Sequence, residues 1–320
     1  MTVADQPPAP TAAVDIRDAF FDHVYELARR DRNLIFLTDD MDAFSLRAFK
    51  RDLPAQFINI GVAEQNLVNV AAGLALGGKR VMAYGIVTFI TSRCFEQIKL
   101  NLCSMRLPVA LVGVGTGFSF GFDGPSHHGT QDLAIMRALP EITIYNPSDS
   151  ALAARCADLA YQADGPVYIR LDKGTFPILT RPGEDGSEGF RVLRPLQDLN
   201  LVSTGFMTSE ALRIAQALEP RGIRAGVVDL YRLKPVNPRF ASTLLARSRR
   251  VVTLEDHAIV GGLGSLVSEL IADAGASIAL QRVAIRDEQF LRYGTRAWFH
   301  RLNGIDVESV VERLAAGGQG

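Results

Sequence analysis

The sequence predicts an α/β fold with two doubly wound domains. Three observations indicate it: short apolar runs alternate with helical patterns, both patterns start again after residue 196, and a charged, glycine-rich stretch separates the two series. Near-continuous apolar runs are typical of parallel strands that are buried on both faces. A chain of 320 residues is long enough for two such domains, each with its own core.

The first domain is expected over residues 15–177. Apolar residues recur at helical spacing over 15–30, and an apolar strand is expected at 33–38. The elements that follow are strands at 57–60, 80–84, 109–114 and 165–171, and helices from residue 64, at 88–103, at 133–138 and after Pro147-Ser148-Asp149. This alternation predicts a parallel sheet that helices cover on both faces.

Residues 178–196 are expected to link the two domains, because the part at 181–189 is charged, glycine-rich and without apolar periodicity. The smaller second domain is expected over 197–320. Its expected elements are strands at 199–204, 226–229, 249–254 and 279–284, and helices at 208–218 and 263–272.

Composition excludes several classes of function. The formal net charge is −1 and no Lys/Arg block occurs, so nothing attracts nucleic acid or an anionic membrane. No apolar run reaches the ~18 residues that cross a bilayer. Cys94, Cys103 and Cys156 lack metal-ligand or disulfide spacing, which indicates buried thiols in a reducing compartment. We therefore expect a cytoplasmic protein, with a disordered leader at residues 1–14 that is not a signal peptide.

The segment at residues 60–66 carries the main candidate functional residue, Glu64. An apolar strand turns over Gly61 and delivers Glu64 to the start of a helix rich in Ala and Gly. Ligands of open α/β sheets bind beyond the carboxyl ends of the strands. A first-turn acid is also favoured by the helix dipole alone, so these residues leave a functional and a purely structural interpretation open.

Three further segments carry candidate site residues. A strand end passes into a helix at residues 84–97, where Phe89 is either a stacking ring or a core residue. The loop at 121–129 holds Asp123 and two adjacent histidines, His127 and His128; it has no apolar periodicity, and no third ligand stands at a metal-site spacing. Arg170 ends another strand, as a surface charge or as an anion-binding group.

Together these motifs resemble the transketolase family of thiamine-diphosphate enzymes, from about residue 15 onward. Residues 61–66 resemble the Gly-(Ile/Val)-Ala-Glu-Gln-Asn signature of the pyrimidine-binding domain, and residues 123–128 resemble Asp-Gly-(Pro/Ala/Gln)-(Ser/Thr)-His-Gln. The resemblance implies that Glu64 hydrogen-bonds N1′ of the cofactor's aminopyrimidine, which helps the thiazolium ring to lose its C2 proton. This chemistry needs a buried carboxylic acid with a proton to share.

The resemblance implies roles for further residues. Glu64 and His127 would be catalytic, and His127 would face the cofactor's amino group and the substrate carbonyl. The implied cofactor-binding residues are Glu64, Phe89, Arg93 and His127, and the implied substrate-binding residues are Asp123, His128 and Arg170. His128 stands where the family has a glutamine.

Residues 227–235 and 254–265 resemble the C-terminal domain of the same family, which serves mainly subunit contacts. Glycines at 261, 262 and 264, just before a helix, would alone suggest a phosphate cradle. His257 is expected to be structural or interfacial.

The chain lacks the other half of a thiamine-diphosphate site. No Gly-Asp-Gly followed at the family's spacing by Asn is found, and this motif would bind the diphosphate and Mg²⁺. The resemblance therefore implies a separate subunit that binds the diphosphate and Mg²⁺, in an α₂β₂ heterotetramer with sites between chains.

Two departures from the family concern the substrate. Phe44 stands where a split transketolase usually has a serine, and Gly115 where it usually has a histidine. Neither side chain can hydrogen-bond a sugar phosphate, so we expect transketolase-type transfer of a two-carbon ketol unit, on a non-standard substrate of a specialised pathway.

Three alternatives remain open. The β subunit of a 2-oxo acid dehydrogenase has the same two domains, but it lacks a loop of the kind at residues 121–129. A 1-deoxyxylulose-5-phosphate-synthase-like enzyme carries all three domains in one chain. A scaffolding or regulatory partner would have no physical need for Glu64, Phe89 and His127 together.

Overall fold

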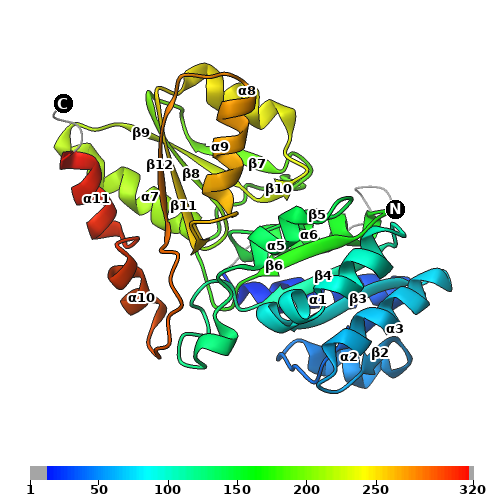
Figure 1. Ribbon diagram of the computed structural model, residues 1–320. Helices are drawn as coiled ribbons and strands as arrows, with labels where there is room; N and C mark the ends of the chain where they lie inside the picture. The colour runs from blue at the N-terminus through cyan, green and yellow to red at the C-terminus, as the bar shows by residue number, and fades with distance from the viewer. Residues whose placement is uncertain (1–12, 317–320) are drawn as a thin grey trace. The chain divides into compact units, whose positions relative to one another are not determined.

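The computed structural model describes residues 13–316 and divides the chain into two compact units. Unit 1 comprises residues up to Gly115 together with Ile135–Ser187, and unit 2 comprises Thr116–Ala134 together with the residues from Glu188 onward. Each unit contains a mostly parallel sheet flanked by helices, as predicted (Figure 1). Apart from Ala13 and Val14, the expected leader lies outside the described residues.

The sheet of unit 1 is parallel throughout and determines where a ligand can bind. Its strands run in the order β5, β6, β4, β3, β1, β2. Their bounds are β1 Leu34–Thr38, β2 Phe57–Asn59, β3 Arg80–Ile86, β4 Val109–Val114, β5 Thr143–Tyr145 and β6 Val167–Leu171. The chain leaves β1 for β2 on one side and returns to β3 on the other, so the strand order reverses between β1 and β3. Ligands of doubly wound sheets bind at such a switch point.

Helices of unit 1 cover this sheet. They are α1 (Ile16–Arg30), α2 (Leu46–Asp52), η2 (Pro54–Gln56), α3 (Glu64–Leu76) and α6 (Ser150–Gln162), whereas α5 (Asp132–Ala138) crosses the boundary of the units. The side chain of Asp149 caps α6 by accepting the Leu152 N–H at 2.8 Å, so the predicted helix start is confirmed. Helix α1 packs against α6, and His23 of α1 lies 2.8 Å from Asp158 of α6.

The sequence predicts one continuous helix over residues 88–103, and this prediction is wrong in its detail. The segments observed are η3 (Phe89–Arg93), α4 (Phe95–Gln97) and η4 (Ile98–Cys103), of which η3 and η4 are π-helical. The Thr91 hydroxyl donates to the carbonyl oxygen of Val87 at 2.6 Å, and such side-chain bonds compete with the α-helical ladder. π-Helical turns are frequent at functional sites.

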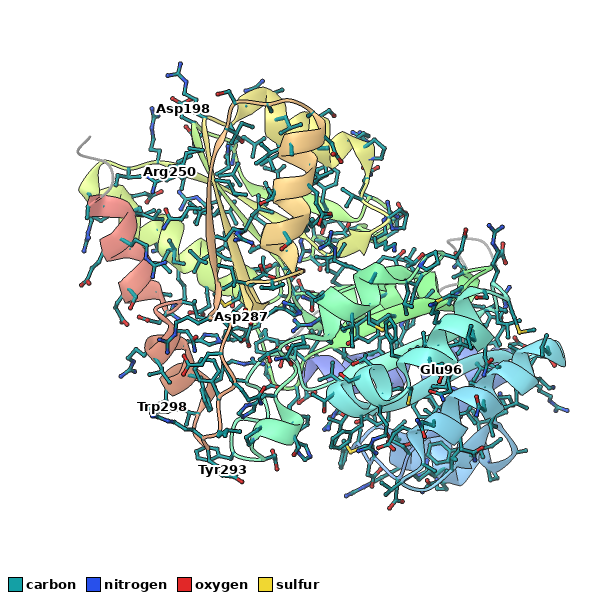
Figure 2. All side chains as sticks on the ribbon, in the orientation of Figure 1. Glu96, Asp198, Arg250, Asp287, Tyr293 and Trp298 are labelled. Carbon is teal, nitrogen blue, oxygen red and sulfur yellow. The ribbon has the colours of Figure 1, made fainter. Side chains whose placement is uncertain are left out.

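The sheet of unit 2 has the strand order β12, β11, β8, β9, β7, with only the β7–β9 pair antiparallel. The bounds of its strands are β7 Phe190–Arg194, β8 Leu199–Ser203, β9 Ala225–Leu230, β11 Arg250–Ala258 and β12 Ala279–Ile285. The short strand β10, Arg232–Lys234, follows β9 in the chain and is not part of this sheet. Arg250, which starts β11, and Asp287, just beyond the neighbouring strand β12, mark the amino and carboxyl ends of these parallel strands (Figure 2). Strand β7 falls inside the segment 178–196, which is predicted from the sequence to be a linker. It pairs only with β9 in this sheet and is therefore an edge strand.

Helices α7 and α11 lie on one face of this sheet and α9 lies on the other (Figure 1). The helices of unit 2 are α7 (Met207–Leu218), η6 (Glu219–Arg221), α8 (Pro238–Arg247), α9 (Leu263–Asp273), α10 (Arg296–Asn303) and α11 (Val307–Ala316). Helices α8, α10 and α11 were not predicted from the sequence.

Phe118 explains why residues 116–134 group with unit 2, although the sequence places them in the first domain. Its ring is fully buried in the core of unit 2 and stacks on Phe299 at a centroid distance of 4.1 Å. Within the described part of the chain, no helix combines the length and the apolarity that crossing a membrane requires.

Candidate functional site

Glu64 lies where the sequence places it, at the first position of α3. The strand β2 ends at Asn59, whose side-chain oxygen accepts the Gly61 N–H at 2.9 Å. Gly61 has a φ of +75°, a left-handed conformation that glycine adopts without strain, and this turn carries the chain into the helix. The Glu64 side chain is 2% exposed, so its carboxylate is held inside unit 1 near the reversal of strand order.

Arg93 pairs with this carboxylate, and Phe89 lies under the Arg93 guanidinium. Nη1 of Arg93 donates to Oε2 of Glu64 at 2.5 Å, and the half-exposed guanidinium lies over the Phe89 ring, 4.6 Å from its centroid. Both residues belong to the π-helix η3, which follows β3. The side-chain amide of Gln65 donates to the Arg93 carbonyl oxygen at 3.2 Å and ties η3 to α3. The structure therefore brings together three of the predicted site residues.

A second buried acid, Asp39, lies beside Glu64, and no role was predicted for it from the sequence. It directly follows β1 and is 5% exposed. Burial, followed by the negative charge of Glu64, raises the pKa of the Asp39 carboxyl to about 7. The sequence feature that could have identified Asp39 is its position directly after the predicted strand at residues 33–38. Burial also raises the pKa of the neighbouring Cys94 thiol to about 12, which keeps that thiol protonated and unreactive.

Arg170 is also placed at the carboxyl edge of this sheet. It is the penultimate residue of β6, pairs in register with Gly113 of β4, and is 2% exposed. Two strands, β4 and β3, separate β6 from β1. A buried guanidinium at a strand end can hold an anionic group with several hydrogen bonds.

The predicted loop residues belong to unit 2 and differ in exposure. Asp123 is exposed, and His127 is partly exposed at the end of the short helix η5 (Pro125–His127), with Nδ1 2.9 Å from the Ser126 hydroxyl. His128 is buried instead. The centroid of its ring lies 5.0 Å from that of Phe118, and burial lowers the pKa of its imidazole. His127 can therefore meet a ligand, whereas His128 fills space in the core of unit 2.

The structure also shows the positions of Phe44 and Gly115, the two residues that differ from those usual in the family. Phe44 lies just before α2 with 71% of its surface exposed, and its ring stacks against the Arg47 guanidinium. Gly115 follows β4 with a φ of +100°, where its N–H donates to the Leu171 carbonyl oxygen at 3.1 Å.

The helix start at Gly262 cannot serve as a phosphate cradle, because the chain's own carboxylate fills it. Glu255 accepts the Leu263 N–H at 2.6 Å and the Gly264 N–H at 2.8 Å. A Cβ on Gly262 would lie 1.9 Å from Oε2 of Glu255, which shows how closely the acid approaches the backbone. His257 is fully buried and its Nε2 accepts the Ala134 N–H at 3.3 Å, in agreement with its expected structural role.

No three His, Cys, Asp or Glu side chains among residues 13–316 are arranged to hold a metal ion. The chemistry of the described site is thus that of a buried carboxylate pair, a guanidinium and an aromatic ring at a sheet switch point. Such a set suits a flat, nitrogen-containing heterocycle, which can stack on the ring and share a proton with the acid.

Comparison with known proteins finds matches to both domains of the chain. Residues 12–177 match the family model for the transketolase pyrimidine binding domain, and residues 189–310 match that for the transketolase C-terminal domain. The chain is 34% identical to an apulose-4-phosphate transketolase subunit of Actinobacillus succinogenes, covering 86% of this chain and 89% of that protein. It is 33% identical to the 6-deoxy-6-sulfo-D-fructose transketolase subunit SqwH of a Clostridium species, covering 92% of each.

A solved structure has the same architecture. It is a split-gene transketolase, described as an inactive β4 tetramer, with a TM-score of 0.84 and 32% sequence identity. The match covers 93% of this chain and 96% of that one, so it includes both domains.

Proposed function

This chain belongs to the transketolase family, as the subunit of a split enzyme that carries the pyrimidine-binding and C-terminal domains, and from this premise we propose what its site does. The assembled enzyme transfers a two-carbon ketol unit from a ketose donor to an aldehyde acceptor. The observation that carries this proposal is the buried carboxylate of Glu64 at the first turn of α3, paired with Arg93, whose guanidinium lies over the ring of Phe89.

The residues present fit the aminopyrimidine half of thiamine diphosphate. Glu64 offers a carboxylate to a ring nitrogen, Phe89 offers a partly exposed ring for stacking, and Oδ1 of Asp39 is a buried oxygen without a hydrogen-bond partner. When bound, thiamine diphosphate supplies a nucleophilic carbon that can carry the two-carbon unit. Glu64 orients the pyrimidine and holds a proton at its ring nitrogen, while Arg93 keeps the carboxylate in place.

The substrate side of the proposal rests on three predicted residues. His127 donates to or accepts from the substrate carbonyl, Asp123 accepts a sugar hydroxyl, and Arg170 holds distal oxygens or an anionic group. The exposure of Asp123 and the partial exposure of His127 support these roles. The substrate-binding role of His128 stays a prediction, and its burial favours packing.

A separate subunit completes the site in this proposal. It binds the diphosphate and most of the Mg²⁺ shell, in an α₂β₂ heterotetramer. Support comes from the missing Gly-Asp-Gly motif and from the similarity to a split-gene transketolase chain that is described as inactive as a β4 tetramer. We also propose a cytoplasmic location, which the three buried cysteines, none of them in a disulfide, support.

The substrate in this proposal is a non-standard sugar of a specialised pathway. Relatives named for apulose 4-phosphate and for 6-deoxy-6-sulfo-D-fructose support it. So do Phe44 and Gly115, because neither can hydrogen-bond a phosphate through its side chain.

We expect the complex with its partner subunit to transfer the ketol unit faster to another aldehyde than to ribose 5-phosphate. A panel of phosphorylated, sulfonated and neutral aldehydes, assayed by product formation, measures this. Phe44→Ser restores a hydroxyl and is expected to improve use of phosphorylated acceptors, whereas Leu76→Ser, similarly exposed at the far end of α3, is the control. Reaction with ribose 5-phosphate alone would contradict the proposed non-standard substrate.

A further inference from the structure

Asp39 is an acid whose carboxyl is held only in part by its hydrogen bonds, which come from the backbone N–H groups of Asp39 itself and Met41. It follows β1 and is almost fully buried, but Oδ1 of its carboxyl has no hydrogen-bond partner. Buried polar atoms are nearly always paired, because leaving one unpaired costs the desolvation of that group. An unpaired oxygen at a sheet switch point can therefore bind a proton or accept a hydrogen bond from a ligand.

The fold makes room for this carboxyl at Gly85. Thr38 and Tyr84 are register partners in β1 and β3, so Asp39 and Gly85 are the next positions along the two strands. A Cβ on residue 85 would lie 2.2 Å from Oδ2 of Asp39, which is shorter than any real contact. Because residue 85 is glycine, the acid can turn into the space beside the strand.

The same short segment is tied to the turn that carries Glu64. The Ile60 N–H donates to the Thr38 carbonyl oxygen at 2.9 Å, and the Asn59 side chain donates to Asp40 at 2.8 Å. The titratable and charged groups that face Asp39 are Glu64 of α3, Arg93 of η3, Cys94 after it and Tyr84 of β3. Only Arg93 is positive, and it already pairs with Glu64.

We propose that Asp39 is a positioning residue of the pyrimidine site, which acts through Glu64 by adding or withdrawing a second negative charge beside it. This inference rests on the proposed function. When Asp39 is ionised, two carboxylates face one guanidinium, and a ring nitrogen bound at Glu64 retains its proton more strongly. When Asp39 is neutral, Glu64 acts alone. Since the pKa of Asp39 is raised to about 7, the change falls within the physiological pH range.

The first test measures the Asp39 carboxyl directly in the full chain without cofactor. Carbon-13 spectra of aspartate-labelled protein, compared with Asp39→Asn, should give a carboxyl that titrates near neutral pH. Glu64→Gln removes the neighbouring negative charge and should lower that midpoint. A midpoint near the ordinary aspartate value of about 4, or one that Glu64→Gln leaves unchanged, would overturn the inference.

The second test measures thiamine diphosphate affinity of the assembled complex between pH 6 and 8. Between pH 6 and pH 8, we expect the ratio of the wild-type affinity to the Asp39→Asn affinity to rise by about tenfold. A coupling of one pKa unit between Asp39 and the bound cofactor corresponds to a tenfold change in binding. Protonation of the free cofactor changes the affinity of the wild type and of Asp39→Asn equally, so it cancels in this ratio. Asp52→Asn is the matched control, because Arg51 and Tyr25 bind this exposed carboxyl and hold its pKa at about 2.

The outcomes separate the two proposals. If the wild-type complex binds no thiamine diphosphate at any pH, the proposed function fails. If it binds, but the Asp39→Asn profile runs parallel to that of the wild type, only the role of Asp39 fails.

Discussion

Replacing Glu64 by glutamine in the assembled complex is expected to lower turnover by about 10²–10⁴-fold, the range that one positioned acid or base contributes. Glutamine keeps the shape of the side chain but cannot carry the negative charge that holds a protonated ring nitrogen. The substitution also removes the partner of Arg93, whose guanidinium is half exposed and can turn to water. Thiamine diphosphate affinity should therefore fall together with turnover, while the fold is retained.

Glu96→Gln is the matched control for this prediction. Glu96 lies in α4, close in sequence to Arg93, but its side chain is exposed on the surface of unit 1 (Figure 2). Turnover and cofactor affinity should equal those of the wild type. If Glu64→Gln itself left turnover unchanged, the chain would be a scaffolding partner and its site would have no catalytic role.

The adjacent histidines should give opposite results when each is replaced by alanine. His127→Ala should lower kcat/KM of the complex by about 10²-fold, because a partly exposed imidazole in a glycine-rich loop is available to the substrate. Its thermal unfolding should not change. His128→Ala removes a ring that packs edge-on against Phe118 and Phe299, and it should destabilise unit 2 by roughly 2–4 kcal/mol.

Measuring kinetics and thermal unfolding of both variants separates the two roles. His128→Phe keeps the ring volume and should recover most of the stability that His128→Ala loses, since burial already keeps the imidazole neutral. A large rise in KM for His128→Phe at unchanged stability would identify His128 as a substrate contact. A loss of stability in His127→Ala would contradict its assignment to the ligand side.

The fold could be predicted where local pattern and tertiary environment agree. The apolar runs of β1, β3, β4 and β6 are buried on both faces and carry no competing signal. The segment 89–103 has a helical pattern, but hydroxyl bonds such as that of Thr91 widen its turns, and periodicity does not encode that effect. Strand β7 was missed because its alternating, charged edge pattern follows a glycine-rich stretch directly.

The candidate site could be predicted only in part. Glu64 and Phe89 carry a resemblance in their local sequence, and the structure brings them together with Arg93. Asp39 carries no such motif. Its burial depends on Gly85 of a different strand, and the pairing of two positions 46 residues apart is visible only in the folded sheet. The phosphate-cradle interpretation of Gly262 failed for the same reason, because Glu255 reaches it from the neighbouring strand β11.

The most direct test of the split site is isothermal titration of thiamine diphosphate with Mg²⁺ into this chain, first alone and then mixed with the diphosphate-binding subunit. The chain presents a carboxylate and a ring for the pyrimidine, and its sequence lacks the motif for the diphosphate. We expect weak or undetectable binding by the chain alone and tight binding by the mixture. Tight binding by the chain alone would contradict the division of the site between two subunits.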